Sequence, residues 1–216
     1  DPKWKIYDVS VVTHAATQMN TSTGPLSGAR VRQALSYAID RNEILEGAAL
    51  GYGQVTGYIP ASDKTWSIPV DELPSYHTDM DKAKELMKEA GYENGFDVTL
   101  RVSPLYILDT ANAQILQQQL KPLGVNIKIE QLEWGNLLDA WVASDFEMIN
   151  ILMLGQPDPD GYTYGRYHSS SPGNYTKLSD PELDTMLEAA RGETDFEKRK
   201  ALYRDIQLKL DTLVPM

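Results

Sequence analysis

The chain has 216 residues, of which 42% are hydrophobic and 24% charged, values typical of a globular protein. Lysine and arginine number 20 against 31 aspartates and glutamates, which gives a net charge of −11. This balance argues against nucleic acid and against an anionic membrane surface as partners, because both are bound through lysine and arginine. No cysteine is present, so disulfides and zinc–thiolate sites are excluded.

Both ends of the sequence suggest a domain cut from a longer protein. Residues 1–5 do not form a signal peptide and lack an initiator methionine, and the chain stops inside the apolar run 213–216. No run of 18 apolar residues occurs, so no membrane-spanning helix is expected. We therefore expect residues 1–216 to be one excised domain.

The first half of the chain predicts a strand, a helix, a loop and a second helix. Apolar residues alternate over residues 6–12, which predicts a strand. Helical spacing of apolar residues over 31–39 predicts a helix, with Ser27 as its N-cap. Residues 51–78 are rich in glycine and proline and predict a long irregular loop, and a second apolar helical face lies within 83–90.

Strands alternate with helices in the second half. Residues 97–102 and 125–129 predict strands, and between them Asp109 is expected to cap a helix. This β-α-β order predicts two parallel strands with a right-handed crossover. A further helix is expected over 134–142, and the almost continuously apolar run 146–154 predicts a central strand buried on both faces.

The alternation predicts one α/β domain that ends in two helices. In sheets of this class, ligands bind beyond the carboxyl ends of the strands. Two loops lie there: the one after 97–102, which carries Tyr106, and the one after 146–154, which carries Gly155 and Gln156.

The motif Asp158-Pro159-Asp160 follows the predicted central strand. A carboxylate at a strand end can accept a charge-assisted hydrogen bond from a ligand ammonium, or it can hold a divalent metal. Aspartate and proline also simply make turns. All three interpretations stay open from these residues alone.

Aromatic residues gather near the same predicted loops: Tyr106, Trp134, Trp141, Tyr162, Tyr164 and Tyr167. Aromatic walls with a few polar groups are typical of pockets for peptides or sugars, although core packing is the alternative for each residue. His14, His77 and His168 lack metal-ligand spacing, so we expect no metal site and no cofactor. Hydrolase-elbow, P-loop and dinucleotide-binding motifs are absent.

The order of segments resembles the extracytoplasmic solute-binding proteins of peptide ABC importers, the oligopeptide, dipeptide and nickel-binding group of family 5. The similarity is carried by residues 30–41 (RVRQALSYAIDR), 83–91 (AKELMKEAG), 125–129 (VNIKI), Glu133-Trp134, Asp158-Pro-Asp160-Gly-Tyr162, 180–184 (DPELD) and 199–203 (RKALY). It spans nearly the whole chain.

The resemblance implies a two-lobed protein of the type II periplasmic-binding-protein fold, of which this chain is similar to the carboxy-terminal lobe only. A mixed sheet flanked by helices, a ligand held between lobes that close by a hinge, and no catalysis are then expected. The implied partners are a small solute or peptide, the amino-terminal lobe and a membrane permease. The implied location is periplasmic or extracellular with a membrane anchor.

The resemblance also implies roles for single residues. Asp158 is the match to an acidic residue that pairs with a peptide α-ammonium, and Trp134 matches a tryptophan that lines the pocket. Tyr106, the Gly155-Gln156 pair, Asp160 and Tyr162 lie in the matching loops. An oligosaccharide-binding member of the same group is one alternative. A metal-dependent glycosyltransferase that uses Asp158-Pro159-Asp160 is the other.

Overall fold

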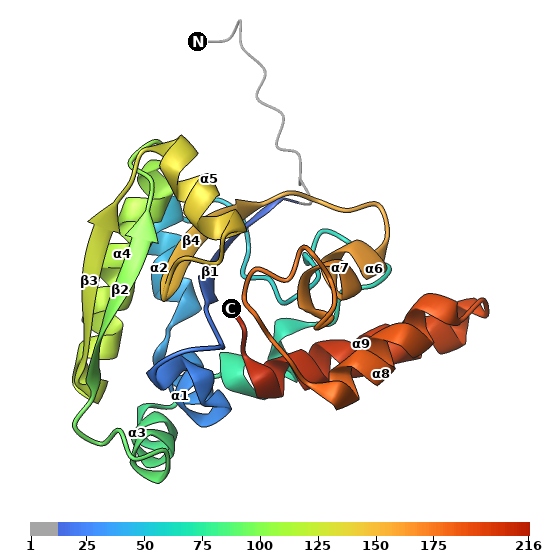
Figure 1. Cartoon of the computed structure of the whole chain (residues 1–216), viewed down its shortest axis with the longest axis horizontal. Coiled ribbons are helices and arrows are strands. Elements are labelled where there is room, and N and C mark those ends of the chain that lie inside the picture. Colours follow the sequence, from blue (N-terminus) through green and yellow to red (C-terminus); the bar gives the residue numbers. More distant parts are fainter. Residues whose placement is uncertain (1–12) are drawn as a thin grey trace, which may run out of the picture.

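The computed structural model describes residues 13–216. Four strands form one mixed sheet in the order β1-β4-β2-β3 (Figure 1). Their bounds are β1 His14–Met19, β2 Phe96–Val102, β3 Val125–Gln131 and β4 Met148–Met153. β2 runs parallel to both β3 and β4, as the β-α-β pattern predicts, and β1 runs antiparallel to β4. The predicted strand over residues 6–12 lies outside the described residues.

Helices cover both faces of the sheet, and the side chains of β4 pack against both layers. Side chains alternate across a strand, so Met148 packs into the core beneath α1 and α4, whereas Ile149 and Ile151 pack into a second core with α5. The helices in this part are α1 Ala29–Ala38, α2 Arg41–Ala49, α3 Met80–Glu89, α4 Ile107–Leu120 and α5 Trp134–Val142. The prediction of a central strand buried on both faces is therefore confirmed.

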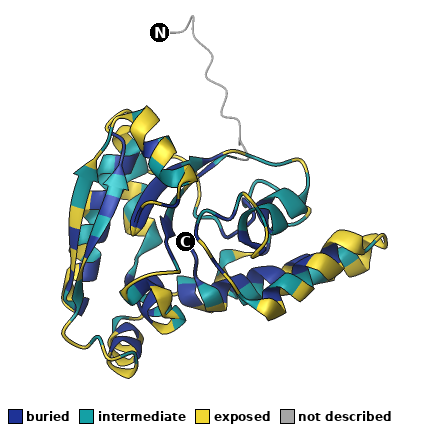
Figure 2. Ribbon diagram, viewed as in Figure 1, coloured by how far each residue is buried: buried dark blue, intermediate teal, exposed yellow. Residues whose placement is uncertain are grey.

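The last third of the chain builds a second body of helices beside the sheet. Its elements are the short helices α6 Pro159–Tyr162 and α7 Tyr164–Tyr167 and the long pair α8 Pro181–Gly192 and α9 Phe196–Leu213. The pair projects away from the sheet, and its outer end is largely exposed (Figure 2). Tyr58 and Tyr167 are buried with the apolar faces of α8 and α9 in a separate core.

The predicted irregular loop over 51–78 is confirmed, with only the 3₁₀ turns Val70–Glu72 and Pro74–Tyr76 inside it. None of the described helices is both long and apolar enough to cross a bilayer. The last residues of the chain lie beside the end of β1, where the Met19 N–H donates to the Pro215 carbonyl at 3.0 Å. That bond joins the two ends of the described chain.

Two expected helix caps were wrong. Gly28, not Ser27, is the N-cap of α1, because the Ser27 hydroxyl donates to the Gly24 carbonyl within the 3₁₀ turn Pro25–Ser27. α4 begins at Ile107, so Asp109 lies inside its first turn and is buried rather than capping it. The helix α2 and the strand β1 were not predicted.

Arg32 connects the start of the described chain to its end. Its guanidinium is buried and donates from Nη1 to the Leu26 carbonyl at 2.7 Å and from Nη2 to the Leu213 carbonyl at 2.6 Å. Nε also donates to the Val214 carbonyl at 3.0 Å. Burial lowers the pKa of Arg32 to about 10, so the group still carries its charge at neutral pH. The carbonyls at the end of α9 thereby gain the donors that a helix C-terminus lacks.

Replacing Arg32 by Gln is expected to lower the free energy of unfolding by about 2–4 kcal/mol, because buried carbonyls at Leu26 and Leu213 lose their charged donor. Urea denaturation at pH 7 measures the change. Arg30→Gln is the matched control: Arg30 lies on the same helix but is exposed and makes only a 3.8 Å ion pair with Glu89. Equal effects of the two substitutions would contradict the structural role of Arg32.

Candidate functional site

Tyr106 and Trp134 meet at the carboxyl edge of the sheet. β2 and β3 are parallel neighbours, so the segments that follow them leave the sheet at the same edge. Tyr106 is the residue before α4, and Trp134 is the first residue of α5, which Glu133 caps by accepting the Gly135 N–H at 2.8 Å. Their ring centroids lie 5.2 Å apart at an interplanar angle of 82°, an edge-to-face contact.

Exposed apolar side chains flank Tyr106 in the sequence and follow the neighbouring strand β4. Leu105 and Ile107, on either side of Tyr106, are 63% and 85% exposed. Leu154, directly after β4, is 68% exposed, and β4 is the other neighbour of β2. Exposed apolar side chains gathered at one edge are typical of surfaces that contact a ligand or another protein.

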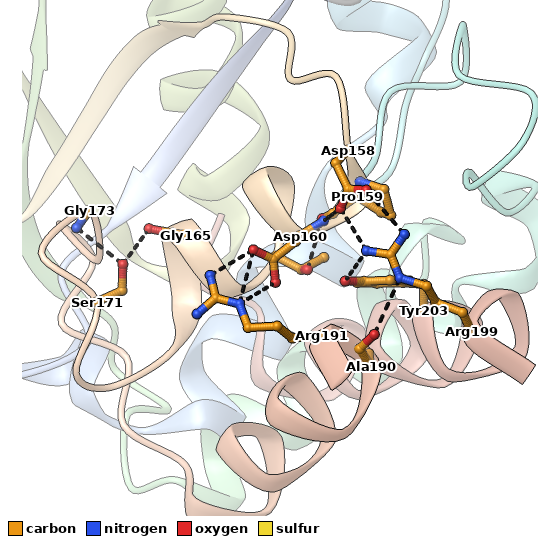
Figure 3. Close-up of polar contacts among 11 residues, drawn as sticks. Asp158, Pro159, Asp160, Gly165, Ser171, Gly173, Ala190, Arg191, Arg199 and Tyr203 are labelled. Atoms are coloured by element: carbon orange, nitrogen blue, oxygen red, sulfur yellow. Dashed lines mark hydrogen bonds and ion pairs between the residues drawn. The ribbon is translucent and has the colours of Figure 1, made fainter. Parts of the chain in front are cut away.

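Asp158 is paired within the chain. It caps the short helix α6 by accepting the Asp160 N–H at 2.9 Å, and Arg199 of α9 donates to its two oxygens at 2.8 and 3.0 Å (Figure 3). The hydrogen bond from Arg199 lowers the pKa of Asp158, partial burial opposes that shift, and the Asp160 N–H adds to the lowering. Both carboxylate oxygens therefore already accept charge-assisted hydrogen bonds.

Asp160 is held in the same way by the other long helix. Arg191 of α8 donates to it from Nη2 at 2.7 Å and from Nε at 3.1 Å (Figure 3). The Arg191 guanidinium also lies over the Tyr164 ring, 3.4 Å from its centroid. We call Asp158–Arg199 and Asp160–Arg191 the two arginine clasps. They fasten the loop after β4 to the helix pair α8–α9.

The remaining predicted residues of this loop support its shape. Tyr162 is fully buried, and its hydroxyl accepts the Gln156 N–H at 2.9 Å. Gly155 and Gln156 are half-buried. The structure thus brings Tyr106 and Trp134 together, and it gathers Gly155, Gln156, Asp158, Asp160 and Tyr162 in one separate loop cluster. Ligand anchoring by Asp158 stays a prediction, and it requires a ligand cation to share or displace Arg199.

A cavity of about 630 Å³ lies beside β1 and was not predicted. Its walls come from β1, α1, α2, the start of α4 and residues 52–62. Asp109 and Asn112 of α4 lie in the wall. The sequence patterns predicted Asp109 only as a helix cap. They gave no signal that Asp109 lines a cavity. Across residues 13–216, no three histidine or acidic side chains gather closely enough to hold a metal ion.

Comparisons with known proteins agree with this geometry. The family model for bacterial extracellular solute-binding proteins, family 5 (middle), matches residues 1–174. The chain belongs to this family. The dipeptide-binding protein of Escherichia coli is 31% identical over 207 residues, covering 91% of the chain and 38% of that protein. Heme-binding protein A of Haemophilus influenzae is 29% identical over 222 residues, covering 100% of the chain and 40% of that protein.

Solved structures show the same fold. The periplasmic binding protein DppA of Helicobacter pylori, in complex with the peptide STSA, superposes with a TM-score of 0.83 at 26% identity, over 94% of the chain and 40% of that structure. HbpA2 of Haemophilus parasuis gives a TM-score of 0.85 at 27% identity, over 95% of the chain and 41% of that structure. The chain thus spans about 40% of the length of these relatives.

Family membership confirms the resemblance and the mixed sheet flanked by helices. The relatives are named as binding proteins, so the non-enzymatic class is confirmed and the glycosyltransferase alternative is set aside. The arginine clasps agree with this result, because they occupy the oxygens of Asp158 and Asp160 that a metal would need.

The first clasp makes stability depend on pH. Because the pKa of Asp158 is lowered in the folded chain, the clasp stabilises the fold above the unfolded pKa of about 4, and this contribution is lost as the pH falls below it. We expect Asp158→Asn to lower stability at pH 7 by less than about 1 kcal/mol, since the pair is partly exposed. The variant should also lose less stability than the native chain between pH 5 and pH 3.

Urea midpoints at pH 7, 5 and 3 measure this difference. Asp205→Asn is the matched control, because Asp205 lies on the same helix as Arg199 and is exposed. A native-like pH profile for Asp158→Asn would show that the clasp does not contribute to stability.

Proposed function

We propose that this chain is the carboxy-terminal lobe of a two-lobed solute-binding protein that serves an ABC importer, and that its solute is a peptide. Support comes from the family match and from relatives named as binding proteins for dipeptides and oligopeptides. The chain covers about 40% of these proteins, which leaves length for a second lobe. The parent protein would be extracellular or periplasmic and membrane-anchored, and it would deliver the solute to a permease.

The observation that carries this proposal is the aromatic contact between Tyr106 and Trp134 among exposed apolar side chains. A peptide offers apolar side chains and a polar backbone, and aromatic rings bind both kinds of group. A second lobe that closes over this edge would remove the exposed surface of Leu105, Ile107 and Leu154 from water.

One lobe supplies only half of such a cleft. The isolated chain should therefore bind solute weakly, because the entropy lost on association is offset by contacts from one side only. Binding at high affinity is expected only in the two-lobed protein.

Calorimetric titration of the two-lobed parent protein tests the function. A library of di- to nonapeptides is titrated beside heme, glutathione and an oligosaccharide mixture. Saturable heat with peptides alone supports the proposal. Binding of heme, glutathione or oligosaccharide in place of peptides would retain the transport function and overturn the peptide as solute. Absence of heat with all of them would overturn both.

In the same parent protein, Trp134→Ala is expected to weaken peptide binding about tenfold or more, because the ring provides both buried area and an edge-to-face partner for Tyr106. Trp66→Phe is the matched control, since Trp66 packs on Phe196 and Tyr203 in the helical body. Tryptophan fluorescence during peptide titration gives both affinities. Equal affinity of the Trp134→Ala variant and the native protein would remove Trp134 from the site.

The ammonium-anchoring role of Asp158 has its own test. Peptides with a free and with an acetylated amino terminus are titrated into the parent protein and its Asp158→Asn variant. Anchoring predicts that the variant loses affinity only for the free peptides, by about tenfold. Unchanged affinity would leave Asp158 with the structural role of its clasp to Arg199.

A further inference from the structure

The cavity beside β1 is mostly apolar and has a small polar region. Its volume of about 630 Å³ falls within the range of pockets for small molecules. The apolar walls are formed by Leu35, Ile39, Ile44, Leu45, Leu116 and Met148. The polar region is formed by Thr17, Asp109 and Asn112. All of these residues belong to the described part of this chain.

A chain of hydrogen bonds fixes the orientation of Asn112. The Asn150 amide donates to the Asp109 carbonyl at 2.9 Å, and the Thr17 hydroxyl donates to Asn150 Oδ1 at 2.6 Å. The single hydroxyl proton of Thr17 is therefore used, so its oxygen accepts from Asn112 Nδ2 at 3.3 Å. This order leaves Asn112 Oδ1 as a buried acceptor without a hydrogen-bond partner among residues 13–216.

Asp109 presents a second acceptor of the same kind. The residue is only 3% exposed, and within the described part of the chain its Oδ2 has no hydrogen-bond partner. Asp109 and Asn112 are three residues apart on α4, so both lie on one helix face. Burial raises the pKa of Asp109 to about 6, which leaves the carboxylate largely ionised at pH 7.5. An unsatisfied buried carboxylate is costly unless a donor binds it.

We propose that this cavity binds an amphipathic primary amine, whose ammonium donates to Asp109 and Asn112 and whose apolar part lies against the walls from α1, α2 and α4. The ammonium is the group that matches two acceptors with its several donors and neutralises the carboxylate. This site is distinct from the Tyr106–Trp134 edge and goes beyond the proposed import function.

The cavity wall contains other charged and titratable groups besides Asp109. Arg41 of α2 lies in the wall, but its guanidinium donates to the Ser36 hydroxyl at 2.7 Å and stacks on the Tyr76 ring at 3.7 Å. Tyr52 and Tyr76 also line the cavity, as does His14 on β1. Histidine side chains in general change charge between pH 5 and 8, so the experiment must separate His14 from Asp109.

Calorimetry or NMR titration of this chain with hexylammonium at pH 7.5 tests the proposal, with 1-hexanol as the uncharged probe of equal length. We expect hexylammonium to bind at least tenfold more tightly than hexanol. Asp109→Asn should remove this preference and leave hexanol affinity within twofold. Asp97→Asn is the matched control, because Asp97 is an exposed acid on β2.

A second variant keeps the test decisive if Asp109→Asn does not fold. Asn112→Ala removes one acceptor and keeps the carboxylate, and it should weaken hexylammonium binding at least threefold. In the native chain, hexylammonium affinity should also fall about tenfold between pH 7.5 and pH 5, because a group with a pKa of about 6 is then mostly protonated. The Asp109→Asn variant should show no such fall.

Several outcomes would overturn the proposal. They are equal binding of hexylammonium and hexanol, native-like binding by Asp109→Asn, no binding of either probe, or a pH dependence that persists in Asp109→Asn and so belongs to His14. Leucine amide and N-acetyl-lysine amide then distinguish an α-ammonium from a side-chain ammonium as the natural group, and tighter binding of either one supports the proposal. Failure of peptide binding at the Tyr106–Trp134 edge would not affect these results.

Discussion

The double burial of β4 is the constraint on which the rest of the structure depends. Its residues contribute to the cores on both faces of the sheet, so β4 joins the core that contains α4 to the core that contains α5. Its neighbours β1 and β2 run in opposite directions. The carboxyl ends of β2, β3 and β4 therefore share one edge, and Tyr106 meets Trp134 there because those strands are parallel. The position of this aromatic contact is thus a consequence of strand direction.

The loop that follows β4 is held by side chains that are distant in the sequence. Arg191 and Arg199 come from the last two helices, yet they hold Asp160 and Asp158 directly beyond the sheet. Planar guanidinium groups suit this task, since each can donate to both oxygens of one carboxylate. The clasps connect the sheet to the helical body, so a movement of α8 and α9 would act on the loop beyond β4.

Much of this fold could be predicted from local patterns. The helix over 134–142 and the buried strand β4 carry strong apolar signals, and both were found within a few residues. α2 was missed because none of its residues is buried and Gly47 stands in its middle. A Cβ at that position would lie 2.8 Å from Ile115 Cδ1, so a larger residue would require the Ile115 side chain to shift. β1 was missed because its alternation of small and polar residues is weak.

The site was predicted less completely, for a physical reason. Local sequence left a turn, an ammonium site and a metal site open for Asp158 and Asp160. Their arginine partners lie 41 and 31 residues away and are brought near only by tertiary packing. The polar region of the cavity likewise combines Thr17 of β1 with Asp109 and Asn112 of α4, which no spacing rule connects. Patterns along a chain predict elements, whereas a pocket depends on which elements become neighbours.

The hydrogen bond between Met19 and Pro215 has a mechanical consequence. It places Met19, near the start of the described residues, beside Pro215, near their end. A unit with adjacent entry and exit can be inserted into the loop of another domain without stretching either crossing segment. If another domain were joined at both points, two neighbouring connections would resist twisting about their common axis better than a single connection would.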